Sequence, residues 1–123
     1  MLCKMTFCFL MLAIFANVSN GQAFTVGGIA FKNEFPGPII VQGTSKINNM
    51  VRNGQPILIQ PGRVGWDLNV PPGPRLINIF DANQPQRILL QNKQVPFQNR
   101  DLYFSVLPIN PLRVDLKERP PGP

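Results

Sequence analysis

The chain has 123 residues, and its 12 Lys or Arg outnumber its 6 Asp or Glu, which gives a formal net charge of +6. It contains no histidine, so nucleophilic catalysis that pairs serine or cysteine with histidine is excluded in its usual forms. Zinc sites need several His or Cys ligands, and the carboxylates are too scattered for a calcium loop. We therefore expect neither enzyme activity, nor a metal, nor a cofactor.

The beginning of the chain has the layout of a secretory signal peptide. Lys4 lies near the start, an apolar run follows over residues 5–16, and small and polar residues come next. The run is shorter than the roughly 20 residues that a transmembrane helix needs. We predict a signal peptide over 1–21, cleaved after Gly21 or Ala23, and hence a secreted, extracellular protein. The alternatives are an uncleaved anchor and an apolar first helix.

Removal of this segment would change the properties of the mature chain. Both cysteines, Cys3 and Cys8, would be lost, so we expect a domain over 22–118 without disulfides, followed by a Pro-rich tail over 119–123. Loss of Lys4 leaves 11 Lys or Arg against 6 acidic residues, a charge of +5 (11 − 6). This excess favours an acidic partner such as an acidic polysaccharide, an anionic membrane or an acidic protein, although it could serve solubility alone. Export argues against nucleic acid.

Proline sets the predicted fold class. The 14 prolines separate short runs rich in Ile, Val, Leu and Phe, and such frequent prolines break long helices. Short β-prone runs between turns are typical of all-β sandwiches and barrels. We predict a single antiparallel β-sandwich of about seven or eight short strands, Ig-like or with a similar Greek-key or meander order.

The predicted strands follow the turns in chain order. The first strands span 24–32 and 37–43, and residues 44–51 could begin a short helix, although we prefer a strand. Asn53-Gly54 favours a two-residue hairpin turn because both residues tolerate positive φ, and Pro61-Gly62 marks the next turn. The later strands are predicted over 75–81, 86–91, 101–107 and 111–117.

Alternation within the strands predicts which side chains share a face. Val64, Trp66 and Leu68 lie in one phase and Asp67 in the other, which favours Trp66 as a core residue. Tyr103 lies opposite in phase to its apolar neighbours, so we expect it to be exposed and a candidate contact for a partner.

Six arginines recur at intervals of 11 to 13 residues near predicted strand starts, where the stem would cover apolar neighbours and the head would reach water. Arg75 follows Pro72-Gly73-Pro74. We favour a type II turn with Pro72-Gly73 at its centre over a stiff recognition loop that presents Arg75. Phe97 lies in the polar stretch 91–100, where it would either contact a partner or fold back to plug one end of the domain.

These observations favour a secreted, non-enzymatic protein that binds an extracellular protein or an acidic polysaccharide through its end loops. One alternative is a protease inhibitor that presents Arg75 on a rigid loop. Another is a cationic host-defence or toxin-like protein that acts on anionic membranes. The candidate contact residues are Pro72, Gly73, Pro74, Arg75, Phe97 and Tyr103.

Overall fold

The computed structural model describes residues 27–121. The predicted signal peptide, its two cleavage points and both cysteines lie outside this range. Residues 27–121 are all-β and contain no helix that could cross a membrane. The strands are β1 (Ile29–Asn33), β2 (Ile39–Ile47), β3 (Met50–Asn53), β4 (Ile57–Ile59), β5 (Val64–Asp67), β6 (Gly73–Asp81), β7 (Gln84–Phe97), β8 (Leu102–Asn110) and β9 (Arg113–Glu118).

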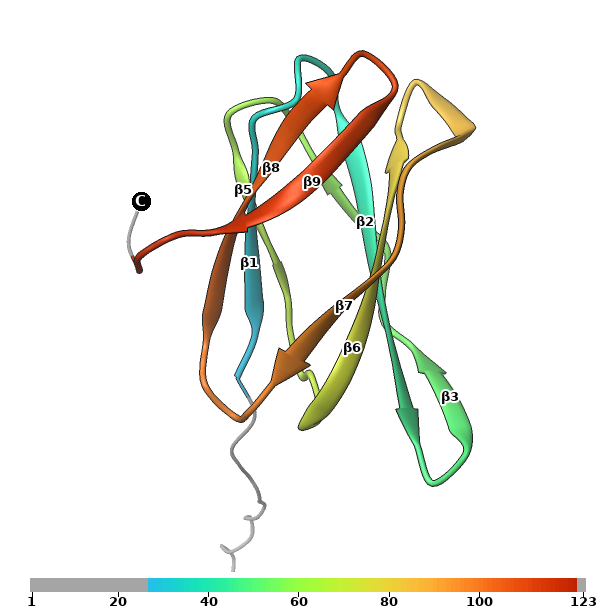
Figure 1. Ribbon diagram of the computed structural model, residues 1–123, viewed down its shortest axis with the longest axis vertical. Helices are drawn as coiled ribbons and strands as arrows, with labels where there is room; N and C mark the ends of the chain where they lie inside the picture. Colours follow the sequence, from blue (N-terminus) through green and yellow to red (C-terminus); the bar gives the residue numbers. More distant parts are fainter. Residues whose placement is uncertain (1–26, 122–123) are drawn as a thin grey trace, which may run out of the picture.

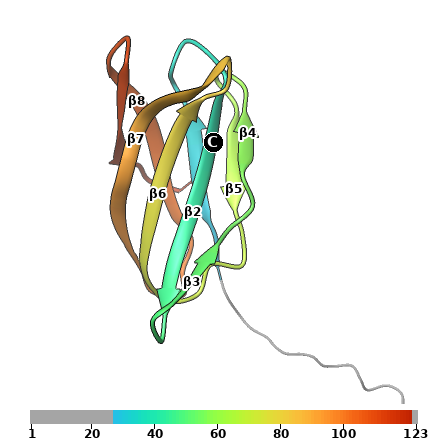
Figure 2. The same cartoon turned by 90° about the vertical axis from the view of Figure 1, so that its right-hand side faces the viewer.

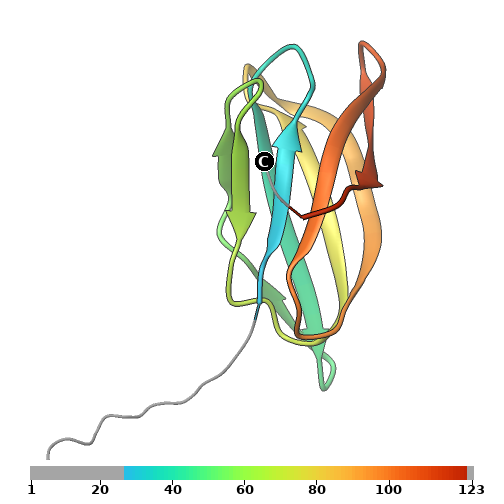
Figure 3. The ribbon, with the colours of Figure 1, turned by 90° about the vertical axis from the view of Figure 1, so that its left-hand side faces the viewer.

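The nine strands form two sheets that lie as two layers (Figure 1). The four-stranded sheet has the order β5-β1-β8-β9 and faces the viewer in Figure 3. The five-stranded sheet has the order β3-β2-β6-β7, with β4 also paired to β2, and faces the viewer in Figure 2. Over residues 27–121 the predicted all-β class is confirmed, with one or two strands more than expected.

One strand pair departs from the predicted antiparallel arrangement. β1 pairs with β8 in parallel, with Ile29 opposite Leu102 and Asn33 opposite Val106, while the other pairs are antiparallel. Parallel strands need a long crossover rather than a hairpin, and here the five-stranded sheet and β5 lie between β1 and β8 in the chain. Local sequence patterns do not specify such a pairing.

The hydrophobic core lies between the two sheets. Buried positions alternate along β2 and β6, as a sheet with one buried face requires. Phe31 of β1 stacks against Phe104 of β8, with ring centroids 6.2 Å apart. Each fully buried large apolar side chain contributes about 1.5–3 kcal/mol. The fully buried apolar side chains include Ile29, Phe31, Ile39, Val41, Ile59, Val70, Ile77, Ile79, Leu89, Phe97, Val106 and Val114.

The predicted hairpin turn at Asn53-Gly54 is wrong by five residues. β2 and β3 are joined at Asn48 and Asn49, whose φ angles are 51° and 65°, and asparagine tolerates this left-handed region in two-residue hairpins. The preferred strand over 44–51 is confirmed apart from this turn. The Pro61-Gly62 turn is also confirmed, because Gly62 has a φ of 79° and the Arg63 N–H donates to the Gln60 carbonyl (3.0 Å).

Strand β7 is longer than predicted. It extends from Gln84 to Phe97, whereas the predicted strand spans 86–91, and so includes most of the polar stretch 91–100. Its register places Phe97 opposite Gly73 of β6, and the Phe97 side chain is only 1% exposed. Phe97 therefore plugs one end of the core, the second of the two predicted roles.

Candidate functional site

The orientation predicted for strand β5 is wrong. Trp66 is 37% exposed and Val64 is 43% exposed, whereas Asp67 is buried. A Cβ atom added to Gly65 would lie 2.7 Å from Cγ1 of Ile59, so the inward side of β5 has no room for a larger side chain at this point. The prediction that Trp66 is a core residue is therefore overturned, and the chain's only tryptophan lies on the outer face of the four-stranded sheet.

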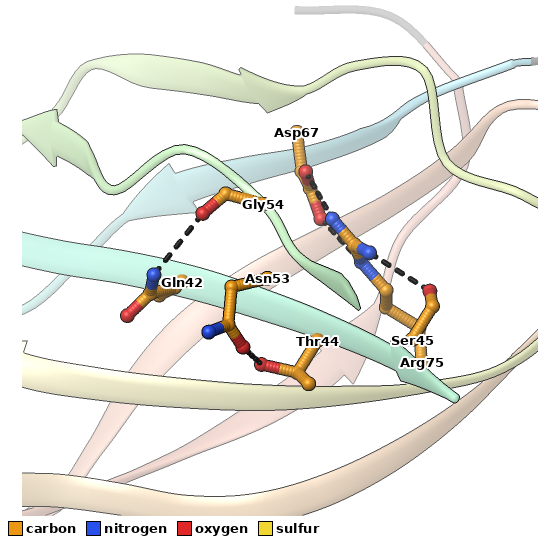
Figure 4. Close-up of polar contacts among 7 residues, drawn as sticks. All are labelled: Gln42, Thr44, Ser45, Asn53, Gly54, Asp67 and Arg75. Atoms are coloured by element: carbon orange, nitrogen blue, oxygen red, sulfur yellow. Dashed lines mark hydrogen bonds and ion pairs between the residues drawn. The ribbon is translucent and has the colours of Figure 1, made fainter. Parts of the chain in front are cut away.

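The buried carboxylate of Asp67 pairs with the guanidinium of Arg75 (Figure 4). Nε and one terminal nitrogen of Arg75 donate to the two Asp67 oxygens at 2.9 and 2.8 Å, and the other terminal nitrogen donates to Ser45 Oγ at 2.8 Å. This paired, charge-assisted geometry is the strong form of such contacts. It joins β5 of one sheet to β6 and β2 of the other.

Two glycines make room for this ion pair. A Cβ atom on Gly43 would collide with Arg75 and Asp67, and one on Gly54 would collide with Arg75. The Gly54 N–H also donates to the Gly43 carbonyl (2.7 Å), which holds the two glycines together. These glycines, together with one arginine and one aspartate between apolar residues, are the sequence signal that could have revealed the pair.

Arg75 is thus a structural residue and departs from the expectation that each arginine head reaches water. Its side chain is 3% exposed, as is that of Asp67. Insertion of Arg75 into the pocket of a protease would require breaking a buried ion pair, which costs about 3–5 kcal/mol. This geometry removes the physical basis of the inhibitor hypothesis.

The structure brings the remaining loop candidates together at one end of the five-stranded sheet. Gly73, at the centre of the predicted type II turn, is instead the first residue of β6 and pairs with Phe97. Its φ of 121° is positive but differs from the roughly +80° of a type II turn. A pocket of about 420 Å³ lies here and has no charged side chain in its lining, so it does not fit an acidic partner. Its lining residues are Pro72, Gly73, Pro74, Gln94, Pro96, Phe97, Gln98 and Asn99.

Tyr103, the last candidate, meets Trp66 on the outer face of the four-stranded sheet. Both residues are register partners of Ala30 in β1, which lies between them. Because the alanine side chain is small, the two rings approach over it, with centroids 5.5 Å apart and planes at 80°. Such an edge-to-face pair contributes about 0.5–1.5 kcal/mol beyond its buried area.

Basic side chains lie beside this aromatic pair. Lys32 of β1 and Lys117 of β9 are both register partners of Ser105 in β8, so their Cα atoms lie roughly 10 Å apart, two strand spacings. The N–H of Arg119 donates to the Tyr103 carbonyl (2.9 Å), which places Arg119 next to the aromatic pair. We call Trp66, Tyr103, Lys32, Lys117 and Arg119 the aromatic-basic face.

The three cations of this face have no ion-pair partner within the part of the chain that the structure describes. Asp115 lies two residues from Lys117 on β9, but its carboxylate pairs with Lys93 of β7 at 3.3 Å. Of the ion pairs within residues 27–121, none involves Lys32, Lys117 or Arg119. These three cations are therefore available to a ligand.

No group of three or more His, Cys, Asp or Glu side chains within the described part of the chain could hold a metal ion. The outer face of the four-stranded sheet thus carries an edge-to-face aromatic pair next to three cations. Comparison of the chain with protein-family models, with curated proteins and with solved structures finds no match.

Proposed function

We propose that this protein is secreted, is not an enzyme, and binds an acidic polysaccharide on the aromatic-basic face. The observation that carries the proposal is the exposed Trp66 held against Tyr103 beside three cations without an ion-pair partner. The proposal differs from the expectation of end-loop binding, because the end pocket carries no charge.

A sugar ring has an apolar face of C–H groups and a polar rim. The indole of Trp66 can pack against the apolar face of the sugar. The ammonium groups of Lys32 and Lys117 can pair with sulfate or carboxylate groups on the polar rim. Aromatic side chains supply large contact areas at interfaces, and exposed ammonium groups attract anions with a strength that falls as salt rises. The two kinds of contact together favour an acidic polysaccharide over a neutral one.

We also propose that residues 22–118 form one β-sandwich domain, followed by the Pro-rich tail. The support is the shared core, to which both sheets contribute buried side chains, and the ion pair between Asp67 and Arg75 that joins the sheets.

Fluorescence of the sole tryptophan tests the binding proposal directly, because Trp66 lies on the proposed face. The purified protein is titrated with dextran sulfate and with neutral dextran, at 0.15 M and 1 M salt. We expect a saturable change with dextran sulfate alone, weaker at high salt because the screening length falls from about 8 Å to about 3 Å. A response to both polymers, or to neither, would contradict the proposal.

Matched variants distinguish binding at the aromatic-basic face from non-specific attraction of dextran sulfate to a positively charged protein. Lys32→Gln with Lys117→Gln is expected to weaken dextran sulfate binding at least about tenfold, equivalent to 1.4 kcal/mol. The control, Arg52→Gln with Arg100→Gln, removes the same charge from exposed positions of β3 and of the β7–β8 loop and should change affinity less than threefold. Equal losses would show that binding follows net charge. Vesicles of anionic phospholipid in place of the polymer test the membrane alternative.

A further inference from the structure

The outer face of the five-stranded sheet (Figure 2) has the opposite chemistry to the aromatic-basic face. Within the described part of the chain, the outward positions of β2, β4 and β6 hold one charged residue, Lys46, near the end of β2. The other positions are apolar side chains, amides and a threonine. We call this surface the neutral face.

An unbroken apolar row crosses the neutral face. Leu58 of β4 is the register partner of Ile40 in β2, Ile40 is the partner of Phe80 in β6, and Phe80 is the partner of Ile88 in β7. The two ends of the row are the most open, since Leu58 is 60% exposed and Ile88 is 43% exposed. A row of this kind across four strands is a contiguous patch rather than scattered exposed residues.

We propose that the neutral face is the interface of a homodimer, with a second copy of this chain as its occupant. The chain carries a formal net charge of +6, so two copies repel each other through most of their surface. The neutral face allows close approach without placing like charges opposite each other. Charge therefore favours a second copy at this face over contacts elsewhere between copies.

The apolar row also matches itself under two-fold symmetry, as an interface between identical copies requires. An axis along the strands and between β2 and β6 reverses the row in the second copy. Leu58 then faces Ile88 of the partner subunit, and Ile40 faces Phe80 of the partner subunit. Aliphatic ends meet aliphatic ends, and the aromatic rings lie near the centre.

The area available passes the lower limit for a specific interface. β2 and β6 each have nine residues, or about 30 Å of strand, and four strands span about 19 Å. Face-to-face packing of sheets would then bury roughly 570 Å² on each copy. The total of about 1,100 Å² exceeds the roughly 1,000 Å² that a specific interface needs.

Sedimentation velocity of the full chain between 1 and 100 µM tests the inference. We expect a species of twice the monomer mass that dissociates on dilution. Leu58→Glu alone and Ile88→Lys alone should each weaken the dimer at least 100-fold, because each places an unpaired charge in an apolar interface. A wild-type protein that remains monomeric at 100 µM would overturn the inference.

The double variant Leu58→Glu/Ile88→Lys tests the symmetry. The two positions are three strands apart within one copy, about 14 Å, but they face each other between copies. We expect the double variant to recover most of the lost dimer, whereas no recovery would refute the two-fold arrangement.

A matched control uses the tip of the β8–β9 hairpin, where Ile109 and Leu112 are also exposed apolar residues. Ile109→Lys with Leu112→Lys should leave the dimer intact. If this control dissociates the dimer and Ile88→Lys does not, the interface lies at the hairpin and the inference is wrong.

Discussion

The two outer faces of this molecule are built by the same alternation of side chains, yet they differ in chemistry. The aromatic-basic face gathers three cations around Trp66 and Tyr103, while the neutral face carries a row of apolar side chains with Lys46 near the end of β2. Because outward positions do not fill the core between the sheets, core packing does not require this difference. The difference is therefore explained by what each face contacts. We propose that the aromatic-basic face contacts an acidic ligand and that the neutral face contacts a second copy of the chain.

If both proposals hold, their geometry has a consequence for affinity. A dimer that packs through its neutral faces would leave one aromatic-basic face open on each side. A long polymer with repeated acidic groups could then engage two faces, and the second contact would gain from effective concentration rather than from new contacts.

The largest expected effect comes from breaking the ion pair between Asp67 and Arg75, which joins the sheets that carry the two faces. Asp67→Asn removes the charge partner of buried Arg75 and should lower the free energy of unfolding by about 3–5 kcal/mol. Urea unfolding measures this loss. Asp115→Asn, at a half-exposed pair with Lys93, is the control and should cost less than about 1 kcal/mol. Equal losses would mean that the buried pair is not the main link between the sheets.

A smaller effect is expected when the space around that pair is filled. Gly43→Ala places a methyl group against the Arg75 guanidinium and should lower the free energy of unfolding by about 1–3 kcal/mol. Gly37→Ala is the matched control, because its added Cβ would lie 3.8 Å from Phe35, an ordinary contact. The same unfolding measurement compares the two, and a harmless Gly43→Ala would argue against a tightly packed ion pair.

The smallest effect concerns the aromatic-basic face alone. A double-mutant cycle of Trp66→Ala and Tyr103→Ala should give a coupling of about 1 kcal/mol in unfolding free energy. A value near zero would show that the rings touch without stabilising one another. In that case the face would be a loose surface rather than an ordered site.

The sequence predicted the fold class because proline spacing and alternation are local signals. The same alternation misplaced β5, since a period of two says which residues share a face but not which face is buried. The prediction placed the three apolar residues of this segment inward and Asp67 outward. The opposite orientation is set by two contacts with other strands: the ion pair of Asp67 with Arg75, and the close approach of Ile59 to Gly65.

The candidate site was predictable only in part. Tyr103 was expected to be exposed from its phase and lies half-buried on the outer face. Its contact with Trp66 depends on the small Ala30 between them and on the register of β1 with two different strands. The register between strands that are so far apart in the chain cannot be predicted from local sequence patterns.

The parallel pairing of β1 with β8 also bears on how the protein folds. The Gly28 N–H donates to the side chain of Asp101, 73 residues further along the chain. Closing so long a loop lowers the conformational entropy of the chain before the stabilising contacts can form. Contacts of this separation slow folding. All strands of the five-stranded sheet precede β8 in the chain, so the four-stranded sheet is the last to be completed during synthesis. Chains that are released early or truncated before β8 would therefore lack Tyr103, Lys117 and Arg119, and with them most of the aromatic-basic face.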